Sequence, residues 1–154
     1  MEDKVFDKLQ GQGITLPAAA TPAANYVPIM QSGNLLFVSG QLPFVDGKLL
    51  ANGLVGEDVA EEMAVACARQ CGLNILAQVK AHTGSLDAIV QIVKLGGFVA
   101  CVPTFTRHPV IINGASDMMV TILGDVGRHA RFAVGAPCLP LGTPVEIDAV
   151  VAIR

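Results

Sequence analysis

The chain has 154 residues, a mass of 16.0 kDa, a formal net charge of −3 and a mean hydropathy of +0.55. Hydrophobic residues make up 52% of it and charged residues 15%, below the roughly 25% of typical globular domains. This balance excludes a disordered chain, and ten Lys and Arg against thirteen Asp and Glu argue against nucleic-acid binding. The length suits one domain whose remaining apolar surface needs a cover, either a membrane or further copies of the chain.

A long run without Asp, Glu, Lys or Arg extends over residues 9–45 and could by length cross a bilayer. Four prolines and four glycines interrupt this run, so it never reaches about 18 unbroken apolar residues. The charged first residues also lack the apolar core of a signal peptide. We therefore expect no contact with a membrane, a cytoplasmic location, and an oligomer that covers the apolar surface.

The first third of the chain predicts mostly short extended segments. Residues 1–25 are expected to be irregular, because a short charged segment is followed by a stretch rich in Ala, Pro and Thr. Residues 26–30 are expected to be extended, and residues 34–39 form a strand bounded by glycines. Residues 44–50 predict a hairpin, since the Asp-Gly pair within them is a strong signal for a tight turn.

The main helix is predicted over residues 57–82. Acidic residues crowd its start, Lys80 and His82 lie near its end, and Gly84 follows directly. This charge order suits the helix dipole, and glycine is the common stop residue. Alanine in the middle favours both helix formation and close packing on a sheet.

The second half alternates strand, helix and strand. Residues 89–102 are rich in Val and Ile and predict a long strand with a bulge or bend at Gly96 and Gly97. Residues 109–123 predict a second helix with proline in its first turn. Residues 129–135 predict a short strand.

The clearest strand is residues 144–153, where five apolar residues alternate with Glu146 and Asp148 on the other face. The order of elements predicts an α+β fold, a mixed sheet with helices on one face. The other face of such a sheet needs a cover, which again points to assembly of several copies.

Motifs for common catalytic and metal sites are scarce. Cys67 and Cys71 lie four residues apart and could share a helix face, but buried free thiols are the stronger interpretation. The sequence carries no phosphate loop, metalloprotease motif or nucleophile elbow. Three scattered histidines are interpreted as surface or capping residues: His82, His108 and His129.

Two charged residues stand in strongly apolar strands, Arg131 in the short strand and Glu146 in the last one. Charges in such positions are costly unless they are paired or functional. Taken alone, the pattern favours a salt bridge within the sheet or outward-facing charges over a functional pair.

A resemblance to a known family supports the functional interpretation. Over residues 26–153 the chain resembles the Rid (YjgF/YER057c/UK114) family of reactive-intermediate enamine/imine deaminases. The resemblance implies a single Rid-like domain over residues 1–154, with a six-stranded mixed sheet and two helices on one face, similar to chorismate mutase. It also implies a homotrimer with a central barrel and three clefts between subunits. It rests on Tyr26-Val27, Asn34-Leu-Leu-Phe-Val-Ser-Gly-Gln-Leu-Pro43, Arg131 with Leu139-Pro140, and Val145-Glu-Ile-Asp-Ala149.

The resemblance also implies roles for individual residues. Arg131 would bind the carboxylate of a small-molecule substrate, and Glu146 would position the attacking water. No metal or organic cofactor is implied. Structural roles stay open for Tyr26, Ser39 and Asn113, and Asn113 matches only after a one-residue length adjustment. The implied substrate-binding residues are Tyr26, Ser39, Gly40, Asn113 and Phe132.

The sequence departs from the family pattern around the arginine. Phe132 and Ala133 stand where the family usually has a hydroxyl residue and then Cys or Thr, and His129 stands where Pro is common. Two alternatives to a deaminase therefore stay open. The first is a trimer that binds small carboxylates without chemistry, and the second is an RNA-cleaving or translation-inhibiting protein, which the acidic pI disfavours.

Overall fold

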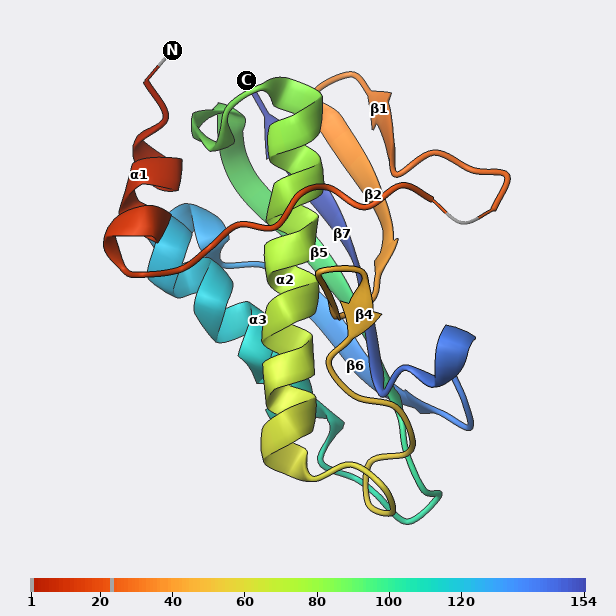
Figure 1. Ribbon diagram of the computed structural model, residues 1–154. Coiled ribbons are helices and arrows are strands. Elements are labelled where there is room, and N and C mark those ends of the chain that lie inside the picture. The colour runs from red at the N-terminus through yellow and green to blue at the C-terminus, as the bar shows by residue number, and fades with distance from the viewer. Residues whose placement is uncertain (1, 23) are drawn as a thin grey trace.

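The computed structural model describes residues 2–22 and 24–154 (Figure 1). Short 3-10 turns at Leu86–Ala88, Gly124–Gly127 and Pro140–Gly142 join some of its elements. The elements in chain order are α1 (Lys4–Gly11), β1 (Ile29–Ser32), β2 (Leu35–Gln41), β3 (Phe44–Val45), β4 (Lys48–Leu49), α2 (Glu61–Thr83), β5 (Ile89–Ala100), α3 (His108–Leu123), β6 (Ala130–Ala136) and β7 (Val145–Ile153).

The main sheet is mixed, which confirms the predicted α+β class. Over the described residues it has five strands in the order β1-β2-β7-β5-β6. β5 and β6 are parallel and joined through α3, while the other neighbours are antiparallel. The expected sixth strand is missing from this sheet, because β3 and β4 pair only with each other. Asp46 and Gly47, both with positive φ, close that short hairpin as predicted.

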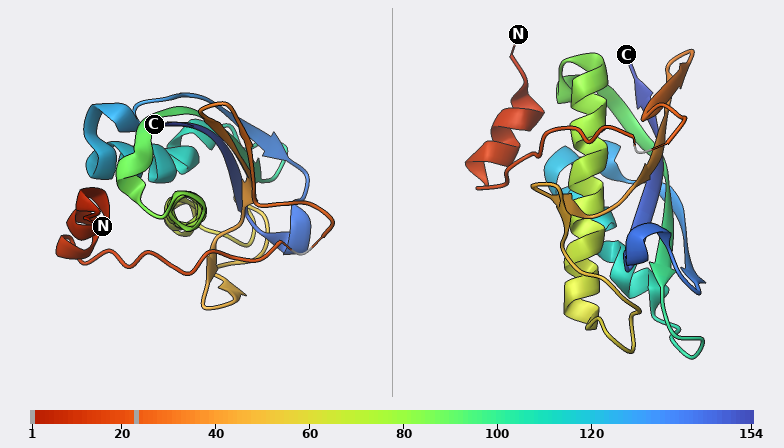
Figure 2. Two further views of the ribbon diagram at one scale, coloured as in Figure 1. Left: turned by 90° about the horizontal axis from the view of Figure 1, so that it is seen from above. Right: turned by 45° about the vertical axis from the view of Figure 1, so that its right-hand side comes forward.

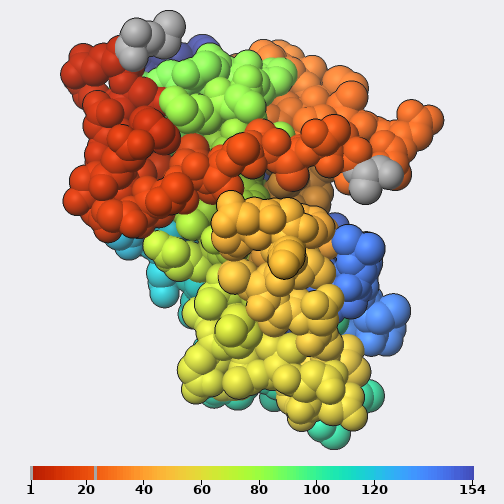
Figure 3. Space-filling view, viewed as in Figure 1, coloured from red at the N-terminus to blue at the C-terminus, as the bar shows by residue number. Residues whose placement is uncertain are grey.

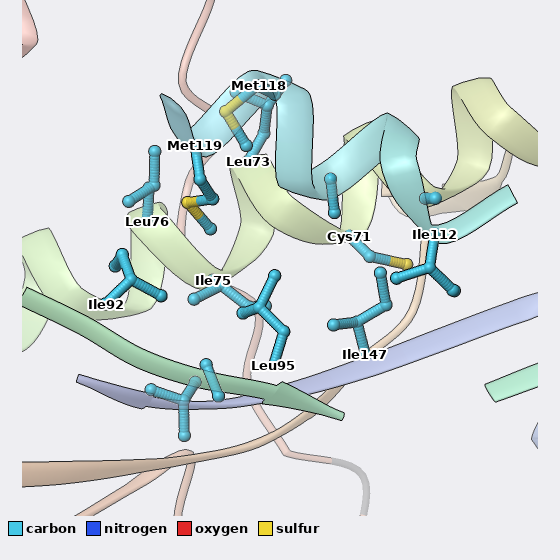
Figure 4. Close-up of a cluster of buried hydrophobic side chains, with 14 of the residues drawn as sticks. Cys71, Leu73, Ile75, Leu76, Ile92, Leu95, Ile112, Met118, Met119 and Ile147 are labelled. Carbon is cyan, nitrogen blue, oxygen red and sulfur yellow. The ribbon is translucent and has the colours of Figure 1, made fainter. Parts of the chain in front are cut away.

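The long helices α2 and α3 lie on one face of the sheet, as predicted (Figure 2). Between the layers, Leu95 and Ile147 from the sheet lie among Cys71 and Ile75 of α2 and Ile112 of α3 (Figure 4). The strict alternation along β7 turns every second side chain into this core.

Segment 12–22 crosses the outer side of α2 (Figures 1 and 3). The Gln78 side-chain amide of α2 donates to the Ala20 carbonyl at 2.8 Å, which ties this segment to the helix. α2 is therefore covered by the sheet, by α3 and by this segment, and all of its residues 71–79 are buried. Burial on several sides explains why the apolar residues of α2 do not lie along one face of the helix.

The predicted bulge at Gly96 and Gly97 of β5 is wrong. The strand passes them in regular register, and its irregularities lie earlier, one of them between Ile92 and Lys94. A Cβ atom at Gly97 would lie 2.6 Å from the Ile112 side chain of α3. Glycine here permits close approach of helix and strand.

The N-terminal segment is not wholly irregular, because residues 4–11 form α1. The Asp3 carboxylate accepts from the Phe6 N–H at 3.0 Å and caps the helix. Asp3 also binds the Lys80 ammonium at 2.8 Å and the Leu86 N–H at 3.0 Å. Burial alone would raise the pKa of Asp3, but Lys80 and these N–H donors hold that pKa below its ordinary value.

Helix α2 begins at Glu61, four residues later than predicted. The acidic residues before it belong to a turn in which the N–H groups of Asp58 and Val59 donate to the Leu54 carbonyl. The predicted end is confirmed, since Gly84 caps the helix with a left-handed backbone.

Among the described residues, one helical stretch is long and apolar enough by composition to cross a membrane, His108–Gly127. Several of its apolar side chains, including Ile111, Met119 and Ile122, are buried in the core. Core helices pass the same test of length and composition, so we describe α3 as a core helix.

Candidate functional site

Glu146 and Asp148 project from β7 onto the face of the sheet that carries no helix. In the register of β5 and β7, Glu146 lies opposite Phe98 and Asp148 opposite Gly96. Both neighbours of Glu146 in the chain are fully buried on the helix side. The predicted alternation is thus confirmed, and it places two carboxylates beside each other on the open face.

A pocket of about 220 Å³ forms where β2 meets β7, lined by Gly40, Phe98, Leu139, Glu146 and Asp148. Gly40 lies at the register irregularity between Val38 and Gln41 of β2. A Cβ atom at Gly40 would collide with the Glu146 carboxylate. Glycine at this position therefore keeps room for the carboxyl group.

A second, mostly apolar pocket of about 420 Å³ also reaches Gly40 and Glu146. Tyr26, Pro28 and Leu141 line it, and Tyr26 is half-exposed. We call Tyr26, Ser39, Gly40 and Glu146 the Glu146 half-site. Ser39 lies beside this pocket, and its hydroxyl donates to the Val27 carbonyl at 2.9 Å, so it fixes the segment that carries Tyr26.

The electrostatics of the Glu146 half-site favour proton transfer. Burial raises the pKa of Glu146, and the negative charge of Asp148 raises it further. Burial also raises the pKa of Asp148, although the Gly96 N–H and the Lys94 ammonium act in the opposite direction. A raised pKa makes a carboxylate a stronger base, which suits it to take up a proton and return it.

Arg131 lies on β6, at the edge of the sheet, with its guanidinium against α3. Its Nη1 donates to Asn113 Oδ1 at 2.9 Å and to Ser116 Oγ at 3.0 Å, and its Nη2 donates to the Pro109 carbonyl at 3.1 Å. These bonds use three of the five N–H donors of an arginine. Within the described part of the chain, the Nε–H and one Nη2–H have no partner. We call Arg131 and Asn113 the Arg131 half-site.

A salt bridge between Arg131 and Glu146, one of the alternatives from the sequence, is wrong. Their strands are not neighbours, because β5 lies between β6 and β7. Arg131 pairs with Leu95, whose side chain is buried on the helix side, whereas Glu146 faces the open side. The strands of the two residues are thus roughly 10 Å apart, and the two side chains lie on opposite faces of the sheet.

Phe132 lies with the Glu146 half-site and not beside Arg131. Its ring meets the Phe98 ring edge to face with centroids 5.3 Å apart, and the Lys94 ammonium lies 5.4 Å from its centroid. Side chains of successive residues in a strand point to opposite faces, so those of Arg131 and Phe132 lie on opposite faces of the sheet. The predicted site residues therefore fall into two groups within one copy of the chain.

Comparison with known proteins identifies the family. Residues 7–149 match the model of the family described as "YjgF/chorismate_mutase-like, putative endoribonuclease". The chain belongs to the YjgF (Rid) family. This confirms the resemblance seen in the sequence.

Relatives of this chain within the Rid family differ in how closely they match it. Protein TCP17 of Trypanosoma cruzi is 45% identical over 98% of this chain and 95% of its own. The crystal structure of Atu1372 of Agrobacterium tumefaciens, whose function is unknown, is 52% identical with a TM-score of 0.91, covering 97% of this chain and 92% of its own. RidA of the Antarctic bacterium Psychrobacter is 28% identical with a TM-score of 0.63, covering 90% and 96%. The chain thus resembles Atu1372 much more than RidA.

Three of the four cysteines of this Rid-family chain are buried, and Cys138 is exposed. Cys67 and Cys71 are buried on α2. Burial raises the pKa of Cys67 to about 11 and that of Cys71 well above its ordinary value. Both thiols therefore stay protonated at neutral pH, which suits packing and not metal binding.

Sequence reasoning missed Ser116, a hydrogen-bond partner of Arg131, and His129, which contacts Ser116. His129 Nε2 lies 2.8 Å from Ser116 Oγ. A signal existed in the sequence, because positions 109, 113 and 116 share one face of a helix and the arginine follows that helix closely. The interpretation of His129 as a surface or capping residue agrees with one of its contacts, because Nδ1 lies 2.7 Å from the carbonyl of Gly127, which ends a 3-10 turn.

Proposed function

We propose that this chain is a deaminase that hydrolyses 2-imino and 2-enamine acids to 2-keto acids and ammonia. Its sites would be composite, with the Arg131 half-site of one copy facing the Glu146 half-site of the next in a homotrimer. The observation that carries the proposal is the guanidinium of Arg131, which is held by three hydrogen bonds and keeps two donors free. The relation to a protein named RidA adds support.

The free donors of Arg131 suit a carboxylate substrate. A guanidinium offers parallel N–H bonds to the two oxygens of a carboxylate, and such pairs are short and directional. Because α3 already fixes the guanidinium, little side-chain entropy is lost when the substrate binds. A carboxylate held there would present its neighbouring imine carbon to a facing Glu146.

Glu146 supplies the proton transfers. It takes a proton from a water while the water oxygen bonds to the carbon of the protonated imine, which forms a tetrahedral carbinolamine. It then returns this proton to the nitrogen, and the C–N bond breaks so that ammonia leaves. The hydroxyl group gives its proton to the Glu146 carboxylate and becomes the carbonyl of the keto acid, and the carboxyl group passes that proton to the departing ammonia. Orientation and proton transfer suffice for an imine, which already hydrolyses in water, so no cofactor is invoked.

The uncovered sheet face supports assembly. It exposes large apolar side chains, among them Met30, Phe37 and Val134, which are 62%, 46% and 44% exposed. Apolar patches of this kind mark contact surfaces. A homotrimer whose open faces meet would bury them. The cytoplasmic location stays a prediction from the sequence.

The endoribonuclease in the family description suggests a second activity. RNA binding depends on neutralising phosphates with basic groups. This chain has a net charge of −3, and Glu146 and Asp148 would repel a phosphate backbone. We therefore favour a small carboxylate as the substrate.

The test is the release of 2-keto acid from an imino acid generated in the assay by an amino acid oxidase. The wild-type chain should accelerate this release, and Arg131→Ala should abolish the acceleration. Lys48→Ala, a change at an exposed hairpin residue, serves as the control. Wild-type rates no higher than those of Arg131→Ala would refute a deaminase, and tight keto-acid binding without turnover would indicate a carboxylate-binding protein instead.

A further inference from the structure

His129 lies directly before β6, two residues from Arg131, and both of its ring nitrogens have partners. Nδ1 lies 2.7 Å from the Gly127 carbonyl, and Nε2 lies 2.8 Å from Ser116 Oγ. A carbonyl oxygen can only accept, so Nδ1 must carry a proton. The structure therefore fixes the tautomer of a neutral His129 as the Nδ1–H form.

The direction of the remaining bonds follows from this tautomer. In a neutral ring Nε2 is an acceptor, so the Ser116 hydroxyl donates to it. The Ser116 oxygen then keeps its lone pairs for the Arg131 Nη1–H, which lies 3.0 Å away. The chain of donors runs from Arg131 through Ser116 and His129 to the Gly127 carbonyl, and each donor meets an acceptor.

The chain of bonds is anchored in two rigid elements. Gly127 is buried at the end of the 3-10 turn that follows α3, where a Cβ atom would collide with the Met119 carbonyl. Ser116 lies on α3 itself, one turn beyond Asn113. The imidazole is therefore held at both ends, and it fixes the rotation of the Ser116 hydroxyl.

We propose that His129 and Ser116 are positioning residues for the substrate carboxylate. By orienting the Ser116 oxygen, His129 locks the plane of the Arg131 guanidinium, so that its Nε–H and remaining Nη2–H point outward together. This role rests on the proposed function, because it matters only if Arg131 binds a carboxylate. In this proposal His129 contributes to binding of the substrate and takes no part in the proton transfers.

The kinetic test uses Ser116→Ala, which removes the hydroxyl and leaves a good helix former. We expect KM to rise about two- to tenfold, the effect of one net hydrogen bond, with kcat nearly unchanged. The dissociation constant of the keto acid 2-oxobutanoate, measured by calorimetry, should rise by the same factor. Thr121→Ala, which removes an exposed hydroxyl from the same helix, should change neither value.

A rescue experiment at His129 distinguishes a positioning role from general damage to the structure. His129→Ala should raise KM as Ser116→Ala does, because Ser116 loses its acceptor. His129→Gln can place an amide oxygen near the position of Nε2 and should restore most of the affinity. Equal effects of His129→Ala and His129→Gln, or none from Ser116→Ala, would overturn the proposal.

A spectroscopic readout works without any substrate. In nitrogen NMR of the wild-type chain at pH 7, His129 should show the Nδ1–H tautomer, and the two Nη atoms of Arg131 should give separate signals because rotation about the Cζ–N bonds is hindered. In Ser116→Ala these signals should merge. An Nε2–H tautomer or merged wild-type signals would overturn the positioning role. If the chain shows no turnover but the two Nη atoms of Arg131 give separate signals, only the proposed deaminase activity is refuted.

Discussion

At the scale of single residues, the site depends on two neighbouring carboxyl groups in unequal environments. Glu146 lies against Gly40 and is half-buried, and Asp148 stands one pleat along on the same face. Burial raises both pKa values, and the charge of Asp148 adds to the rise at Glu146. In the proposed reaction, this arrangement would suit Glu146 for proton transfer and would give Asp148 a role in setting the pKa of Glu146.

Replacing Asp148 tests this tuning. Asp148→Asn removes a negative charge near Glu146, so the pKa of Glu146 should fall, since a like charge raises it. The acid limb of the kcat/KM profile should then move to lower pH, by less than about one pH unit for a partly exposed pair. The measurement is the rate of keto-acid release between pH 4 and 8. A limb that stays in place or moves to higher pH would contradict the role of Asp148.

At the scale of elements, helix α1 shows how residues far away in the sequence stabilise a short helix. Its capping carboxylate, Asp3, is tied to Lys80 of α2, and Asp87 accepts from the N–H groups of Lys4 and Val5 at 3.0 Å. An eight-residue helix has little stability by itself. α1 therefore depends on tertiary capping.

The Asp3 cap predicts a specific pH dependence of stability. Because the pKa of Asp3 is lowered in the folded chain, its contribution is present above the ordinary pKa near 4 and is lost as the pH falls through the lowered value. Asp3→Asn should reduce the free energy of unfolding by about 1–3 kcal/mol at pH 7 and by much less at pH 2. Urea denaturation at both pH values measures this, with the exposed Asp7→Asn as the control. A loss that is equal at both pH values would contradict the ion pair.

A comparison of the predicted with the observed elements shows which of them the sequence can predict. β7 was predictable because a two-residue alternation specifies both a strand and its buried face. The end of α2 was predictable because glycine at position 84 is a local signal. α1 was not, since its partners Lys80 and Asp87 lie about 80 residues away in the chain. The glycines of β5 were misinterpreted because both make room for side chains of other elements, Gly96 for Asp148 and Phe132 and Gly97 for Ile112.

At the scale of the whole molecule, strand order decides how the site is built. The sequence singled out Arg131 and Glu146 and left a salt bridge between them open, but it did not show that β5 separates their strands. The parallel crossover from β5 through α3 puts β6 at the edge, and β7 enters between β2 and β5. No local pattern encodes that order. One copy therefore holds Arg131 and Glu146 on opposite faces, and the proposed function needs another copy to bring them together.

Assembly should depend on the open face of the sheet. Phe37 is 46% exposed there, between β1 and β7. Phe37→Lys should leave the fold of each chain intact, because the side chain is outside the core, but it should disrupt the trimer. Sedimentation should show about 48 kDa for the wild type, three chains of 16.0 kDa, and a smaller mass for the variant. Circular dichroism checks the fold, and an unchanged mass would exclude this face from the interface.

Mixing two inactive variants tests the composite site most directly. Arg131→Ala keeps Glu146, and Glu146→Gln keeps Arg131, so each variant alone should lose nearly all keto-acid release. If each cleft takes its arginine from one copy and its glutamate from the next, trimers reassembled from equal amounts should recover about a quarter of the wild-type rate. A mixture no more active than the separate variants, although the trimers have exchanged chains, would contradict a site shared between copies.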